Sequence, residues 1–281
     1  MIPTAFDYVA PTSVAEALAA LAGGDDVKVL AGGQSLLPVL RMRLNAPDRL
    51  VDLGRIPELV GVRAEGETLV IGAMTPYVAL LADPLVATHA ALLHKAIGTV
   101  ADPQIRRRGT VGGALVHADP AGDLGAPILA LDASLVIVGP DGERTVAASD
   151  FFTGLFETAV AEGELLTAIR IPIHTGWGGH YEKFVRVAQQ WSIVAVAATV
   201  RLEGDRIAEA KIGLTNMGAT ALRAGAVEAA LAGAAAADVA PACMAAAEGT
   251  SPPSDLNGTD DYRRHLATVL TRRAVLAAAG W

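Results

Sequence analysis

The stretch Val29-Leu30-Ala31-Gly32-Gly33-Gln34-Ser35-Leu36-Leu37-Pro38 contains the pattern from which the fold can be inferred. An apolar run ends on two glycines, a polar pair follows, and the spacing then becomes helical. This order predicts a strand, a tight turn and a helix. Glycine adopts positive φ and has no Cβ, so backbone can approach a ligand closely. The following helix offers unpaired N–H groups and the positive end of its dipole, which together suit a phosphate.

A second stretch, Arg108-Gly109-Thr110-Val111-Gly112-Gly113-Ala114-Leu115, repeats this pattern. Again two adjacent glycines follow a small polar residue. A single glycine pair is most often only a turn, but two such loops in one chain indicate a ligand with two phosphates. Neither loop matches G-x-x-x-x-G-K-[ST] or G-x-G-x-x-G, which argues against P-loop and Rossmann sites.

Composition limits the classes of function. The chain has 281 residues, enough for two or three domains, and 52% of them are hydrophobic. The net charge is 22 − 30 = −8, which disfavours nucleic acid or an anionic membrane as the main partner. Cys243 is the single cysteine, so the chain alone can hold neither a disulfide nor an iron–sulfur cluster. We find no signal peptide and no apolar run of about 18 residues, and expect a cytoplasmic protein.

The order of elements predicts an α+β fold in three units, residues 1–57, 58–174 and 180–281, with a linker at 175–179. Hydrophobic periodicity and turn residues place the elements. Strands are predicted at 27–31, 49–53, 68–72, 134–138, 144–147, 165–171, 181–187, 192–202 and 206–215. Helices are predicted after the capping box at 13–16 and at 35–44, 79–82, 85–98, 219–232, 241–248 and 260–279. Residues 27–53 predict a parallel strand pair. Tyr262, Leu266, Val269 and Leu270 mark the expected buried stripe of the last helix.

The segment Thr99–Asp123 is predicted to be a long irregular region, and such regions are usually functional. His117, Asp119 and Asp123 are candidate metal ligands, but a ribose or flavin contact for Asp123, or a helix N-cap at either aspartate, is the favoured interpretation. At least one residue of Arg106–Arg108 is expected to pair with an anion. No nucleophile elbow or Ser/His/Asp arrangement appears, so the sequence does not support hydrolysis.

The two glycine loops, Ala31-Gly32-Gly33-Gln34-Ser35 and Thr110-Val111-Gly112-Gly113-Ala114, resemble the paired FAD-pyrophosphate loops of the molybdenum hydroxylase flavin subunits. The similarity is to medium subunits of the carbon monoxide dehydrogenase type, and it covers nearly the whole chain. Further similar motifs are Phe6-Asp7-Tyr8, Pro11-Thr12-Ser13, Leu50-Val51-Asp52-Leu53, Asp119-Pro120-Ala121-Gly122-Asp123 and Lys183-Phe184.

This resemblance implies a two-subdomain FAD-binding fold of the vanillyl-alcohol-oxidase/PCMH type, followed by a C-terminal domain with a three-stranded antiparallel sheet and helices. The FAD pyrophosphate is expected between the two loops. The implied cofactor-binding residues are Ala31, Gly32, Gly33, Gln34, Ser35, Leu36, Thr110, Val111, Gly112, Gly113, Ala114, Asp123, Leu165, Leu166, Lys183 and Trp191.

Four of these residues have more specific implied roles. Asp123 matches an acidic residue near the cofactor, and Leu165 or Leu166 an apolar residue whose backbone faces the isoalloxazine. Lys183 matches a lysine near the pyrimidine end of the flavin, and Trp191 an aromatic residue close to the ring. Without the resemblance, Lys183 would be interpreted as a solvated charge at a sheet edge and Trp191 as a core residue.

The function implied by the resemblance is electron relay. A large partner with a molybdenum–pterin cofactor oxidises substrate, and a small partner with [2Fe–2S] clusters passes electrons on. FAD on this chain collects them and releases them to an external acceptor, within a dimer of heterotrimers. The similarity favours a carbon monoxide dehydrogenase, while relatives that hydroxylate N-heteroaromatics or aldehydes remain open. A stand-alone FAD oxidase or reductase and a non-enzymatic scaffold are the alternatives. No acid–base catalyst is then needed here.

Overall fold

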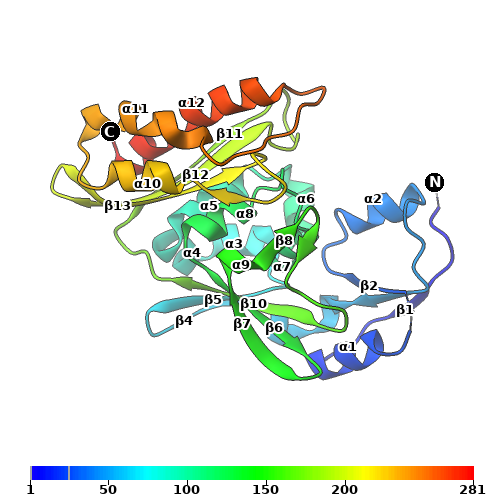
Figure 1. The fold of residues 1–281 in the computed structure, drawn as a ribbon. Helices are drawn as coiled ribbons and strands as arrows, with labels where there is room; N and C mark the ends of the chain where they lie inside the picture. The colour runs from blue at the N-terminus through cyan, green and yellow to red at the C-terminus, as the bar shows by residue number, and fades with distance from the viewer. Residues whose placement is uncertain (1, 25) are drawn as a thin grey trace.

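A computed structural model describes residues 2–24 and 26–281, which form three sheets with flanking helices (Figure 1). The first sheet has the order β1-β3-β2 and is parallel, so the predicted parallel pair is confirmed. The strand β1 was not predicted. It is three residues long and exposed throughout, so it shows no alternation of buried and exposed positions. This unit contains β1 (Asp7–Val9), α1 (Val14–Leu21), β2 (Val27–Leu30), α2 (Leu36–Arg41), β3 (Arg49–Asp52) and the short 3₁₀ turns Leu53–Arg55 and Pro57–Leu59.

The second sheet is antiparallel and has the order β4-β5-β10-β6-β7. The strands predicted at 134–138 and 144–147 are confirmed and form a hairpin, with Gly139 paired to Gly142 at its end. The strands are β4 (Val62–Glu65), β5 (Thr68–Gly72), β6 (Ser134–Gly139), β7 (Gly142–Ala147), β8 (Phe152–Gly154), β9 (Glu157–Thr158) and β10 (Leu165–Pro172), of which β8 and β9 form a separate pair. The helices are α3 (Tyr77–Ala82), α4 (Pro84–His89), α5 (Ala91–Gly98), α6 (Pro103–Arg108), α7 (Val111–His117), α8 (Gly125–Ala130) and α9 (Ala148–Phe151).

The prediction that Thr99–Asp123 is irregular is wrong, because α6 and α7 lie within it. Each helix has a side-chain cap. Asp102 Oδ1 accepts hydrogen bonds from the backbone N–H groups of residues 104 and 105 at 2.7 and 2.9 Å. Thr110 Oγ1 accepts from Gly113 N at 3.2 Å. The glycine pair of the second loop lies in the first turn of α7, where the Thr110 cap offsets the low helix propensity of glycine.

The third sheet is antiparallel, with the order β11-β12-β13-β14. Its strands are β11 (Gly178–Phe184), β12 (Val194–Glu203), β13 (Arg206–Thr215) and β14 (Leu222–Arg223). The three predicted strands are confirmed, and β14 adds a fourth, two-residue strand. Residues 178–179 belong to β11 and not to a linker. A Cβ at Gly179 would lie 2.7 Å from Leu92 N, so this glycine permits close packing on α5 and is no sign of flexibility.

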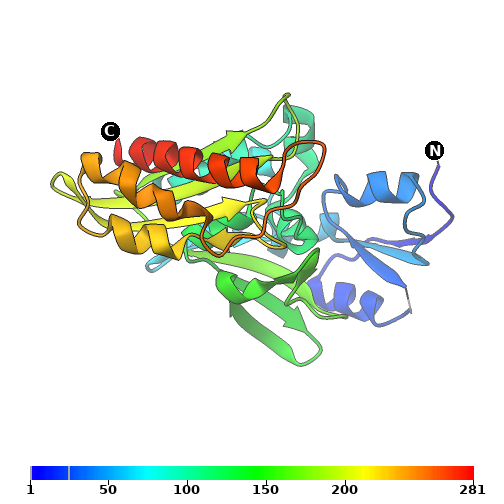
Figure 2. The ribbon, with the colours of Figure 1, turned by 45° about the horizontal axis from the view of Figure 1, so that its top comes forward.

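The third sheet is buried on both faces. Along β12, Val194 and Val196 belong to the core of the C-terminal unit, while Ala195 and Ala197 belong to the core of the second unit. Because successive strand residues point to opposite faces, the valines face α12 and the small alanines face α5 and α8. Figure 2 shows this sheet between the C-terminal helices and the second unit.

The C-terminal helices cover the outer face of this sheet. They are α10 (Gly225–Leu231), α11 (Val239–Ala242) and α12 (Asp260–Ala279), with 3₁₀ turns at Ala236–Asp238 and Cys243–Ala247. The bounds of α12 are as predicted, but its buried stripe begins differently, because Tyr262 is exposed and Arg263 is fully buried. The Arg263 guanidinium donates to the carbonyl of Ile193 and pairs with Asp255 at 2.8 Å. None of the helices in the described ranges is long and apolar enough to cross a membrane.

We predict that Gly213→Ala lowers the free energy of unfolding by about 1–3 kcal/mol, the usual cost of overpacking. A Cβ at this position on β13 would lie 2.2 Å from the carbonyl oxygen of Ala126 in α8, so strand and helix must separate. Urea denaturation measures the effect. Gly98→Ala is the matched control, because a Cβ there meets nothing within 4 Å. Equal stability of the two variants would contradict the close packing of β13 on α8.

We predict that stability falls between about pH 9 and pH 11 in a way that depends on Cys243. Burial raises the pKa of this thiol from an ordinary value of 9.0 to about 11. Above pH 9 the unfolded chain loses the thiol proton while the folded chain keeps it. The unfolded state is thereby stabilised, so the free energy of unfolding falls. The loss is roughly 2–3 kcal/mol for a shift of about two pKa units. Urea titrations at pH 9 and pH 11 measure the free energy of unfolding of wild type and of Cys243→Ala. The loss between the two pH values should be larger in wild type, and an equal loss in both proteins would contradict the prediction.

Candidate functional site

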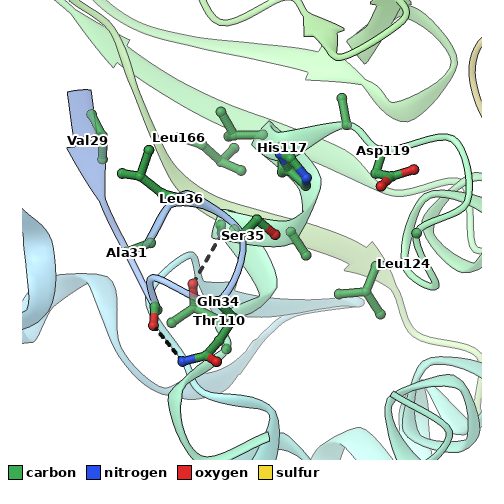
Figure 3. A pocket seen from close by; sticks show the side chains of 18 of the residues that line it. Val29, Ala31, Gln34, Ser35, Leu36, Thr110, His117, Asp119, Leu124 and Leu166 are labelled. Carbon is green, nitrogen blue, oxygen red and sulfur yellow. Dashed lines mark hydrogen bonds between the residues drawn. The ribbon is translucent and has the colours of Figure 1, made fainter. Parts of the chain in front are cut away.

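A cavity of about 980 Å³ lies where the three units meet. Ligand-binding cavities usually measure about 300–1,000 Å³, so this one suits a large ligand. Fifteen of the sixteen residues implied by the resemblance line it. The exception is Val111, whose side chain is buried in the core of the second unit. Figure 3 shows side chains of both glycine loops, such as Gln34, Ser35 and Thr110, around this space.

The two glycine loops touch each other at one side of the cavity. A Cβ at Gly32 would lie 2.2 Å from the carbonyl oxygen of Arg108 and 2.8 Å from the Cα of Gly109. A Cβ at Gly113 would lie 3.0 Å from the Cβ of Ala31. Segments about 75 residues apart in the chain are therefore neighbours, as the paired-loop prediction requires. Their glycines are needed for contact between the loops themselves.

The first loop presents a row of unused backbone donors. The N–H groups of residues 32–36 donate no hydrogen bond to any residue within 2–24 or 26–281. Gly33 has φ +75°, so the chain turns at this glycine, and Gln34 Nε2 donates to Gly32 O at 3.1 Å. Five consecutive free amides at a cavity wall form an anion-binding surface.

The second loop does not repeat this chemistry, contrary to the prediction. Its N–H groups donate within the protein: Val111 N to Thr75 O, Gly112 N to Ala73 O, and Gly113 N and Ala114 N to Thr110, at 2.8–3.2 Å. The physical reason is that Thr110 caps α7 while the segment before α3 accepts the remaining donors. This loop therefore contributes a close backbone wall to the cavity.

Asp123, which also lines the cavity, is the centre of a buried polar cluster. Its Oδ2 accepts from Lys183 Nζ at 2.7 Å, and its Oδ1 from Tyr181 Oη at 2.9 Å and Ser192 Oγ at 3.0 Å. The Asp123 and Lys183 side chains are 5% and 9% exposed, so Lys183 is not a solvated edge charge. Burial and the charge of Asp123 raise the pKa of Tyr181, which keeps its hydroxyl a donor.

The metal interpretation is not supported. Among the residues the structure describes, no group of three histidine, cysteine, aspartate or glutamate side chains could hold an ion. Asp119 instead accepts from Ala121 N at 2.9 Å as a turn cap. His117 lines the cavity wall.

The expectation that one of Arg106–Arg108 binds an anion at this site is wrong. None of the three lines the cavity. They occupy the last turn of α6, where cations complement the helix dipole. Arg106 donates to the carbonyl of Val100 at 2.6 Å and so holds the chain that enters the helix.

Trp191 lines the cavity and is 53% exposed, so it is not a core residue. Leu165 and Leu166 of β10 are buried and form part of the wall. Sequence reasoning missed Tyr77 and the segment Val100–Asp102, which also line it. Ala101 has φ +41°, an unusual value for alanine. The Asp102-Pro103 pair marks a helix start and is the one available clue to that segment.

Comparison with known proteins identifies the family. Residues 4–174 match the model described as the FAD binding domain in molybdopterin dehydrogenase. The chain belongs to this family. Residues 179–278 match the CO dehydrogenase flavoprotein C-terminal domain. The cofactor of the family is FAD, and the row of free amides beside a cavity of this size fits a dinucleotide diphosphate.

Individual relatives agree over the full length. The carbon monoxide dehydrogenase medium chain of Hydrogenophaga pseudoflava is 42% identical, over 99% of this chain and 98% of the relative. The glyceraldehyde dehydrogenase medium chain of Sulfolobus acidocaldarius is 37% identical over 98% of each. The structure of a Hydrogenophaga pseudoflava carbon monoxide dehydrogenase lacking the Mo-pyranopterin moiety superposes with a TM-score of 0.96, at 44% identity, covering 100% of this chain and 99% of that one.

We predict that Lys183→Met costs about 3–5 kcal/mol of folding stability, because it leaves Asp123 buried without its charged partner. The double variant Asp123→Asn/Lys183→Met should recover part of the loss. Urea denaturation of both single variants and the double variant measures the coupling. Lys28→Met is the control, since its pair with Asp26 is half exposed and contributes little. Additive single effects would contradict the ion pair.

Proposed function

We propose that this chain is the flavin subunit of a molybdenum-containing carbon monoxide dehydrogenase, and that it holds FAD in the cavity described above. The observation that carries the proposal is the row of free N–H groups at residues 32–36, closed on its other side by the second glycine loop. Backbone donors of this kind bind phosphate oxygens without any basic side chain. The placement of arginines away from the cavity agrees with such a site.

In this proposal, the residues along the cavity have separate tasks. The amides of residues 32–36 bind the diphosphate, and the loop at 110–114 closes against it. Lys183, held by Asp123, places a positive charge in the cavity wall, which also includes the half-exposed Trp191. FAD supplies the redox chemistry when bound, and the protein binds and orients it. We assign no acid–base catalyst to this chain.

We further propose that electrons reach the flavin from [2Fe–2S] clusters of a small partner subunit, and leave to an external acceptor. A large partner with a molybdenum–pterin cofactor would oxidise carbon monoxide, in a cytoplasmic dimer of heterotrimers. Two observations support this assignment. Full-length relatives are named as medium chains, and the chain has one cysteine. The single thiol, Cys243, is buried in the C-terminal core, so the clusters must reside elsewhere.

Purification of the complex from its native source tests this assignment. The expected result is one FAD per chain, co-purifying subunits that contain molybdenum and iron–sulfur clusters, and bleaching of the flavin absorption by carbon monoxide. Bleaching by an aldehyde or N-heteroaromatic compound instead would identify another substrate for the complex. Turnover by the chain without partners would indicate a stand-alone FAD oxidase or reductase, and absence of flavin a scaffold.

We predict that Gly33→Val abolishes FAD retention. Gly33 has φ +75°, and a Cβ there would lie 2.9 Å from the Leu37 side chain, so valine would rearrange the row of amides. Gly66→Val is the matched control, because Gly66 also has positive φ (+58°) but lies in an open turn, with nothing within 4 Å of its Cβ position. Flavin content after purification measures the effect. Equal flavin loss in both variants would point to general backbone strain and contradict the specific role of the first loop.

A further inference from the structure

Tyr77 is a cavity residue that the paired-loop pattern does not explain. It is the first residue of α3, is 6% exposed and lines the cavity. Its backbone N–H donates to Gly109 O at 3.0 Å. A Cβ at Gly109 would lie 2.7 Å from the Tyr77 ring, so the ring is packed directly against the second loop.

The Tyr77 hydroxyl has no hydrogen-bond partner among the described residues, although the ring is more than nine-tenths buried. The Tyr77 hydroxyl is not fully enclosed by protein. In the described residues, the polar side-chain atoms that are both fully enclosed and without a partner are Arg49 Nε, Arg263 Nε and Thr271 Oγ1. The hydroxyl therefore retains access to the cavity. The other buried tyrosine at this site, Tyr181, donates to Asp123 in the usual way. Because the Tyr77 hydroxyl has no partner among the described residues and faces the cavity, it is free to donate to a molecule bound there.

Tyr77 lies where the second loop meets the cavity, because its ring contacts Gly109, the residue before that loop. Burial, together with the charge of Asp123, raises the pKa of Tyr77. The hydroxyl therefore stays protonated and is available as a donor. The same cavity is lined by the Asp123–Lys183 pair.

We propose that the Tyr77 hydroxyl is a further FAD-binding group, which donates a hydrogen bond to an oxygen of the ribityl chain. The inference rests on the proposed function, since the ribityl chain links the diphosphate to the flavin ring, and Tyr77 packs beside the second loop in the cavity that Lys183 also lines. Tyr77 is a binding residue in this role and takes no part in proton transfer.

Equilibrium titration of the full-length, flavin-free chain with FAD and with ADP tests the proposal. The variant Tyr77→Phe keeps the ring and removes only the hydroxyl. Its Kd for FAD should rise about three- to ten-fold, the range that one net hydrogen bond supports. Its Kd for ADP should be unchanged, because ADP has the diphosphate but no ribityl chain. Tyr8→Phe is the control for both ligands, since Tyr8 is exposed and its hydroxyl donates to Asp52 outside the cavity.

The outcomes separate this inference from the function on which it rests. If wild type binds FAD and Tyr77→Phe binds it equally well, the inference is overturned while the proposed function stands. Equal weakening for FAD and ADP overturns the ribityl assignment, because the hydroxyl would then act on the diphosphate or on the fold. If wild type binds neither ligand, both proposals fail. The unfolding temperature of Tyr77→Phe, expected to equal that of wild type, shows that a change in Kd is not a loss of structure.

Discussion

The architecture of the cavity depends on a contact between two stretches of backbone. Gly32 lies against the Arg108–Gly109 peptide, where a Cβ would clash with backbone, and Gly113 lies close to the Cβ of Ala31. Because Gly32 has no side chain, the first unit and the second unit meet backbone to backbone beside the proposed diphosphate site. A contact of this kind cannot adjust through rotamer changes, so the relative position of the two loops is tightly constrained.

The contact also explains why the two loops differ in function. Thr110 and the segment before α3 use the amides of the second loop, so that loop is held rigidly. The amides of residues 32–36 are left free beside it. One loop thus serves as a fixed wall and the other as the row of donors. A ligand that binds between them meets a preorganised surface, which reduces the entropic cost of binding.

The C-terminal unit completes the cavity through the same use of small residues. The alanines of β12 and Gly213 of β13 let α5 and α8 pack closely on the sheet. This brings Tyr181, Lys183 and Ser192 to Asp123, where three donors satisfy one buried carboxylate. The cluster joins the third unit to the second in the wall of the cavity, so residues from all three units build that cavity.

The sequence by itself determined the longer strands, the long last helix, the two glycine loops and, through resemblance, the cofactor. These features depend on local periodicity, on turn residues and on motif spacing, which neighbouring residues encode. Only the tertiary structure decided which amides of the two loops are free, that Arg106–Arg108 lie away from the cavity, and that Lys183 is buried while Trp191 is exposed. It also revealed Tyr77. Hydrogen-bond partners and burial are set by residues distant in the chain, so no local pattern carries that information.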